Sequence, residues 1–174
     1  YPQDTSQTQL SDGRAVPFVV RVESATINRG IARIAVLDDP AARGEGKPFA
    51  PTNWNHRVLQ VFGESCGVGF RQGVNTPTYV LGGVPSGIST DSILINFAGG
   101  TDRLGQGDVV LHSTLAAFGN HCNQLVSMET TSMVREHVIE QYGPIDFMVG
   151  TNGSGAALQQ YNAINTAPGL LNAA

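Results

Sequence analysis

The feature that most constrains the fold is the alternation of strand-like and helix-like segments over residues 108–164. Residues 108–115 (DVVLHSTL) and 145–149 (IDFMV) are apolar and read as strands. Between them, apolar residues recur at helical spacing over 124–142, and Gly143-Pro144 ends that segment. Strands separated by a helix are joined by a right-handed crossover, which favours a parallel sheet. The sequence therefore predicts an α/β fold with a mostly parallel sheet flanked by helices.

The rest of the chain supplies three further strands and one further helix. The strands are expected at residues 16–23, 30–37 and 57–62, and the helix at 156–164. Residues 38–54 are rich in turn-forming residues and are expected to form a loop. Residues 70–107 are expected to form a long excursion with one helix, and residues 1–14 a polar segment that precedes the domain.

Composition excludes several classes of function. The 174 residues suit one domain of ordinary size, and only 14% are charged, against about 25% in typical globular proteins. The ten Lys and Arg residues are scattered and the net charge is −4, which argues against a nucleic-acid partner. No apolar run approaches the roughly 20 residues that span a bilayer, so no membrane partner is expected.

The two cysteines, Cys66 and Cys122, lie 56 positions apart and form no CxxC pair. The common zinc and thioredoxin-like spacings are therefore missing from the sequence, and neither a metal nor another cofactor is expected. The pair is either two free buried thiols or one disulfide. The polar first residues are typical of a mature protein after signal-peptide cleavage, and with a disulfide they would indicate a secreted or periplasmic protein.

The turn at residues 149–157 (VGTNGSGAA) is the strongest indication of chemistry. It lies between an apolar strand and a helix, where a serine such as Ser154 projects above the carboxyl edge of a sheet. Backbone N–H groups at the start of the next helix can then stabilise an oxyanion. The sequence departs from G-x-S-x-G at Asn152 and Ala156, so a plain glycine-rich turn with an incidental serine stays open. A dinucleotide-binding turn is less favoured, because the glycine spacing and the position late in the chain do not match.

A second glycine-rich segment supports the esterase interpretation. Residues 63–67 (GESCG) follow the third of the main strands. In folds that carry a nucleophile on a strand–turn–helix elbow, the loop after the third strand supplies an oxyanion N–H. The alternative for this segment is a flexible glycine loop.

Four segments, at residues 57–70, 119–122, 129–142 and 150–160, resemble a family of largely uncharacterised secreted bacterial α/β-hydrolases. That family is distantly similar to the tannase and feruloyl esterase group, and the resemblance covers roughly residues 16–174. It implies that Ser154 is the nucleophile and that the N–H groups of Glu64, Ser65 and Gly155 form the oxyanion hole. In the strand order of that fold, the loops carrying Cys66 and Cys122 lie at one sheet edge, which implies a disulfide between them.

The sequence does not complete the catalytic triad of that fold. The triad order is Ser, then Asp or Glu, then His, yet no Asp, Glu or His follows Ser154. The four histidines, His56, His112, His121 and His137, all precede it. Residues 15–174 are therefore expected to be the N-terminal half of an α/β-hydrolase domain that ends just after the elbow. A second polypeptide from the same precursor would supply the remaining strands, the acid and the histidine; otherwise these residues are a truncated part of a longer chain.

Three functions remain after this reading. The first is a secreted serine hydrolase that cleaves an ester, or an amide, through an acyl-enzyme on Ser154. The second is a non-catalytic α/β module for binding or structure. The third is the non-catalytic partner chain of an autoprocessed amidase. Such an amidase carries its nucleophile at the first residue of one chain, and Tyr1 is not a nucleophile of that kind. If the chain acted alone, His121, beside Cys122, would be the leading candidate for the base.

Overall fold

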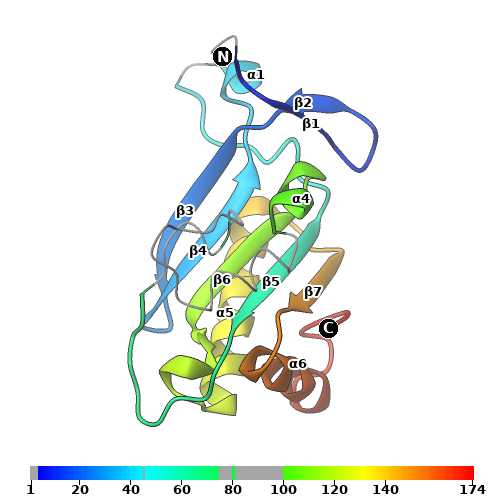
Figure 1. Cartoon of the computed structure of the whole chain (residues 1–174). Coiled ribbons are helices and arrows are strands. Elements are labelled where there is room, and N and C mark those ends of the chain that lie inside the picture. The colour runs from blue at the N-terminus through cyan, green and yellow to red at the C-terminus, as the bar shows by residue number, and fades with distance from the viewer. Residues whose placement is uncertain (1–3, 45, 75–79, 81–99) are drawn as a thin grey trace.

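A computed structural model describes residues 4–44, 46–74, 80 and 100–174. Its centre is a five-stranded sheet with the order β3-β4-β6-β5-β7 (Figure 1). The strands are β3 (Val20–Ile27), β4 (Gly30–Leu37), β5 (Arg57–Gly63), β6 (Val109–Ala117) and β7 (Phe147–Thr151). All five correspond to strands that the sequence predicts; β4 has the predicted ends, and the other four strands have shifted ends.

The sheet is mixed rather than mostly parallel. β3 pairs antiparallel with β4, and β4 pairs antiparallel with β6, whereas β5 lies parallel to both β6 and β7. β3 and β4 are antiparallel because a two-residue turn joins them, in which Asn28 and Arg29 have φ angles of 50° and 64°. Positive φ at both central residues defines a type I′ turn, which joins antiparallel strands. The predicted parallel arrangement is therefore confirmed for β5, β6 and β7 and is wrong for β3 and β4.

Helices pack on both faces of the sheet. On one face, α5 (Gln124–Tyr142) packs mainly on β6, and α6 (Gly155–Thr166) packs mainly on β5. On the other face, α4 (Gly100–Gly105) packs on β4 and β6. The predicted helix at 124–142 is confirmed residue for residue: Asn123 caps its start by accepting the Val126 N–H, and the N–H of Gly143 closes its end on Ile139.

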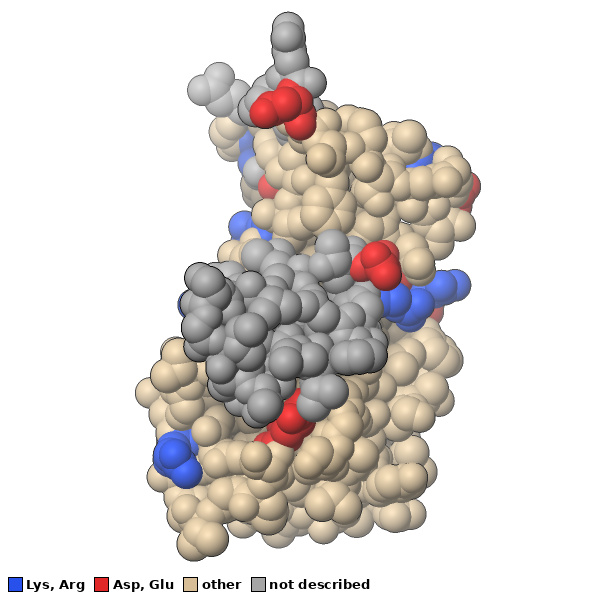
Figure 2. Space-filling view, in the orientation of Figure 1, with Lys and Arg blue, Asp and Glu red and all other residues tan. Residues whose placement is uncertain are grey.

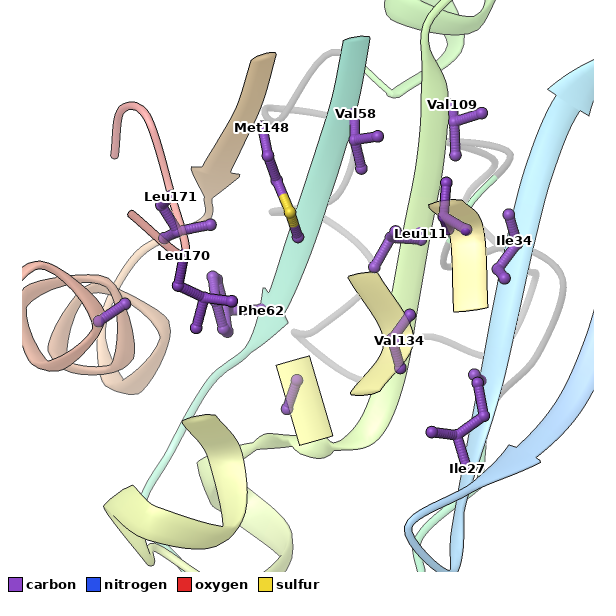
Figure 3. Packing of buried hydrophobic residues seen from close by; sticks show 14 of the residues in the cluster. Ile27, Ile34, Val58, Phe62, Val109, Leu111, Val134, Met148, Leu170 and Leu171 are labelled. Atoms are coloured by element: carbon purple, nitrogen blue, oxygen red, sulfur yellow. The ribbon is translucent and has the colours of Figure 1, made fainter. Parts of the chain in front are cut away.

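Two hydrophobic clusters follow from the alternation of side chains along the strands. In β4, Ile34 and Val36 point into the cluster under α5 and α6, whereas Ala35 points into the cluster under α4. The larger cluster is drawn in Figure 3, where Phe62, Leu111, Val134 and Met148 meet between the sheet and the helices. This packing holds the parallel strands in place, so that their carboxyl ends meet at one edge.

The N-terminal part differs from the sequence-based expectation. The single strand expected at 16–23 is divided into β2 (Ala15–Pro17) and β3. β2 pairs with β1 (Gln7–Gln9), which lies in the polar segment expected to precede the domain. The loop after β4 contains one helical turn, α1 (Pro40–Arg43), capped by Asp39. Of the excursion expected at 70–107, residues 75–79 and 81–99 lie outside the described residues, and α4 lies at its end.

The distribution of basic side chains and the character of the helices bear on nucleic-acid and membrane partners. On the face drawn in Figure 2, the Lys and Arg side chains that are described lie in small separate groups rather than in one patch. In the part of the chain that the structure describes, no helix combines the length and apolar character needed to cross a bilayer.

Candidate active site

Ser154 lies at the tip of the turn that joins β7 to α6. Its φ and ψ angles are 59° and −126°, and Asn152 two residues earlier has a φ angle of 99°. Such values are rare for residues with a Cβ and cost about 1–3 kcal/mol each, so they persist only where the surroundings enforce them. The Ser154 side chain is exposed and does not cap α6. The turn therefore presents the hydroxyl away from the sheet.

The backbone of Gly155 lies directly against that of Ser65. A Cβ at position 155 would stand 1.8 Å from the Ser65 carbonyl oxygen and 2.9 Å from the Ser65 nitrogen, so only glycine fits. Within the described residues, the N–H groups of Ser65 and Gly155 have no hydrogen-bond acceptor. One donor without an acceptor therefore lies in the residue after Ser154 and another in the loop that contacts it. An oxyanion is stabilised by donors of this kind.

The loop after β5 is held to the segment after β6. Gly119 donates its N–H to the Glu64 carbonyl at 2.7 Å, and Gly67 donates to Phe118 at 2.8 Å. Cys66 and Cys122 form a disulfide with a Cα separation of 4.7 Å, as the resemblance implied. A disulfide that closes a loop of this length is worth about 4 kcal/mol in the chain-entropy model. The loop is therefore anchored independently of the turn at Ser154.

A cavity of about 520 Å³ opens beside this loop. Its polar lining residues are Glu64, Ser65, Arg71, His112, Asn120 and Asn152. The size is within the range of pockets that take small ligands. Among the described residues, no group of three or more His, Cys, Asp or Glu side chains is placed to hold a metal ion.

His121 is not available as a base, although it lies near this edge. Its Nδ1 accepts the N–H of Asn123 at 2.9 Å, so the ring proton is on Nε2, which donates to the Leu115 carbonyl at 2.9 Å. The ring is 8% exposed. Both nitrogens thus have structural partners, and the interpretation of His121 as a base for a chain acting alone is not supported.

The other three histidines also have structural contacts. His112 is buried and its Nδ1 donates to the Val61 carbonyl at 2.8 Å. His56 contacts the Pro144 carbonyl at 2.9 Å. His137 lies 2.6 Å from Glu23, whose carboxylate also accepts the Tyr142 hydroxyl. These contacts lie on elements away from the turn at Ser154, except for His112, which lines the cavity.

The Glu23 carboxylate and Tyr142 shift each other's titration. Burial raises the pKa of Glu23, but the hydrogen bonds from Tyr142 and His137 outweigh it and hold the pKa below its usual value. Burial, together with the charge of Glu23, raises the pKa of Tyr142 well above its usual value. This cluster joins β3 to the end of α5 and belongs to the fold rather than to the site.

Two glutamines of α6 face the site and were not singled out from the sequence. Gln159 is fully buried and Gln160 is 7% exposed. Gln159 falls on the buried face of the helix with Ala156 and Ala163, at positions i, i+3 and i+7. Gln159 could have been singled out from the sequence as a polar amide on an apolar helical face, because a buried amide needs hydrogen-bond partners.

Comparison with known proteins gives one result. The model of a tannase-like family of unknown function (DUF6351) matches residues 1–174. A search of curated proteins gives no match.

Proposed function

Because the chain belongs to this tannase-like family over its whole length, we propose that it is a serine hydrolase that cleaves ester bonds. The observation that carries the proposal is the backbone at Ser154, with φ of 59° and ψ of −126°, next to Gly155, whose backbone lies against that of Ser65. Strain of this kind concentrates at functional sites. A strand–turn–helix elbow of α/β-hydrolase type accounts for it, and the fold is proposed to be related to that class.

The proposed reaction proceeds through an acyl-enzyme. The Ser154 Oγ attacks the ester carbonyl carbon while a histidine takes the hydroxyl proton. The negative charge on the carbonyl oxygen is stabilised by the N–H groups of Ser65 and Gly155, and that of Glu64 belongs to the same loop. The C–O bond then breaks, and the histidine returns the proton to the leaving alcohol. Water activated by the same histidine hydrolyses the acyl-enzyme and releases the acid, and an amide would follow the same steps.

We propose that the histidine and its acid come from residues outside these 174, on a second polypeptide or a further segment. No Asp, Glu or His follows Ser154 in the sequence, and the contacts of the four histidines leave none of them beside Ser154 in the described residues. The triad order of this class requires both partners after the nucleophile.

The surface beside β7 supports that proposal. Leu158, Tyr161 and Ile164 form an apolar stripe on α6, and they are 53%, 67% and 53% exposed. The stripe borders a groove of about 250 Å³ that also contacts Ala174. Ala173 forms an isolated parallel bridge with Val149 and accepts the N–H of Gly150 at 2.9 Å, on the side of β7 that faces away from β5. An additional strand and a covering helix would bury this stripe.

A secreted or periplasmic location is proposed for the same protein. The Cys66–Cys122 disulfide is consistent with an oxidising compartment, where such bonds persist.

Labelling of the intact protein with a fluorophosphonate tests the proposed nucleophile. Labelled peptide should contain Ser154, and Ser154→Ala should lose both the label and the hydrolysis of p-nitrophenyl esters by at least about 10³-fold. Ser132→Ala, an exposed serine on α5, is the matched control and should behave as the unmodified protein. A Ser154→Ala protein that keeps its activity would exclude this mechanism.

The same experiment separates the alternatives. Protein that takes no label on any chain is a non-catalytic module. Label on a different chain, at its first residue, identifies an amidase with an N-terminal nucleophile.

A further inference from the structure

Three successive carbonyl groups at the end of β5 are each bound by a side chain from another element. The register between β5 and β6 breaks between Val61 and Gly63. Around that break, His112 donates to the Val61 carbonyl at 2.8 Å, Asn152 donates to Phe62 at 3.0 Å, and Gln159 donates to Gly63 at 2.7 Å. Such breaks re-aim the chain near active sites, and here the chain turns into the loop that carries Ser65.

Gln159 is the member of this set that joins the loop to the helix after Ser154. Its Nε2 donates to the Gly63 carbonyl and, at 3.3 Å, to the Gly155 carbonyl, while its Oε1 accepts the Ser127 hydroxyl at 2.5 Å. The side chain is fully buried, so water does not compete for these bonds. One amide therefore bonds to Gly63, two residues before Ser65, and to Gly155 itself.

The neighbouring amides hold the turn from the other side. The Asn152 side chain donates to the Phe62 carbonyl through its Nδ2 and accepts the Gly153 N–H at 3.0 Å through its Oδ1. Gln160 donates to the Asn152 carbonyl at 2.8 Å. The loop and the turn are thus joined by side-chain amides, and no backbone ladder connects Gly63 with Gly155 in the described residues.

We infer that Gln159 is a positioning residue that sets the distance between the Ser65 and Gly155 N–H groups. It does not touch the substrate and acts through the Gly63 carbonyl and α6. This role rests on the proposed esterase function, because the spacing of two donors matters only where both must reach one developing oxyanion. A shift of about 1 Å in such a group is enough to lower a rate about 100-fold.

Steady-state kinetics of Gln159→Met in the intact protein test the inference. The methionine fills the same space without donating a hydrogen bond, so kcat should fall about 10- to 100-fold while KM stays within about threefold. Val134→Ala, a buried residue of α5 outside the site, is the control, since it lowers the melting temperature without a fall in kcat. A Gln159→Met enzyme with the kcat of the unmodified protein overturns the inference.

The pH profile of Gln159→Glu gives a second and independent reading. An ionised carboxylate cannot donate to the Gly63 carbonyl, whereas a protonated one can. The ratio of variant to unmodified kcat should therefore rise as the pH falls, and a flat ratio would count against the role. If Gln159→Met does not fold, this ratio decides the question. If Ser154→Ala stays active the proposed function fails, whereas normal Gln159 variants beside an inactive Ser154→Ala reject the positioning role alone.

Discussion

Backbone strain gathers where the loops after β5, β6 and β7 meet. Ser65, Cys122, Asn152 and Ser154 all have positive φ angles, between 41° and 99°. Each such residue costs on the order of 1–3 kcal/mol. The disulfide and the amide hydrogen bonds offset that cost.

Gly155→Ala should be the most damaging small substitution at this edge. Its Cβ would stand 1.8 Å from the Ser65 carbonyl oxygen, so the loop must move away. We expect the unfolding free energy to fall by about 1–3 kcal/mol and kcat/KM to fall at least 100-fold. Gly153→Ala is the matched control, because nothing lies within 4 Å of its added Cβ. Urea denaturation measures the unfolding free energy and ester hydrolysis measures kcat/KM. Equal effects of Gly155→Ala and Gly153→Ala would contradict this prediction.

At the scale of elements, α5 is tied to the edge of the sheet by charge as well as by packing. Glu23 of β3 accepts hydrogen bonds from Tyr142 and His137 at the end of α5. Because the pKa of Glu23 is lowered in the folded state, this stabilisation is present above the ordinary pKa of 4.5 and is lost as the pH falls through the folded value. The raised pKa of Tyr142 acts in the opposite sense: stabilisation is complete below pH 10.0 and is lost as the pH rises beyond it.

Tyr142→Phe should therefore destabilise the protein in a pH-dependent way. At pH 7 the loss of a hydrogen bond to a charged group should lower the unfolding free energy by about 1.5–3 kcal/mol. The difference from the unmodified protein should be smaller at pH 3, because the Glu23 carboxylate takes up protons as the pH falls toward its lowered pKa. Glu136→Gln, an exposed acid on the same helix, should have no comparable effect at either pH. Urea titrations at the two pH values check this, and a loss that is equal at both would contradict it.

At the scale of the whole molecule, one group of exposed apolar side chains lies beside β7. Phe147 of β7 is 40% exposed, and the α6 stripe of Leu158, Tyr161 and Ile164 is more exposed still. Exposed apolar groups that adjoin the outer strand of a sheet favour association, either with the proposed additional chain or between copies.

Leu158→Asp combined with Ile164→Asp tests whether that stripe is an interface. In residues 1–174 expressed alone, which we expect to be inactive and to aggregate, the double change should increase the monomeric fraction. In the intact protein it should reduce activity and thermal stability, because charges would be buried without partners. Met133→Asp, on an exposed part of α5, should do neither. Size-exclusion chromatography and ester hydrolysis are the measurements, and an unaffected intact protein would exclude the stripe as an interface.

Local patterns were enough to predict the five strands of the main sheet, the long helix and the position of the turn at Ser154, but not β1 or the division of β2 from β3. Residues 124–142 have helical periodicity with a cap at each end, and the glycine-rich segments follow strands whose apolar composition is plain. The antiparallel hairpin was missed because its signal is only two residues long, with Asn28 as its turn former. The nucleophile, predicted as Ser154, stays a prediction, whereas the Cys66–Cys122 pairing is confirmed.

The sequence by itself therefore determined the order of the elements and the chemistry available at their ends. Only the tertiary structure decided which of those ends meet, because β5, β6 and β7 come together through pairings that span long stretches of chain. The contact of Gly155 with Ser65 and the bond of Gln159 to Gly63 each join residues that no local period connects. Hydrogen bonds between distant segments depend on packing geometry, and that geometry exists only once the core has formed.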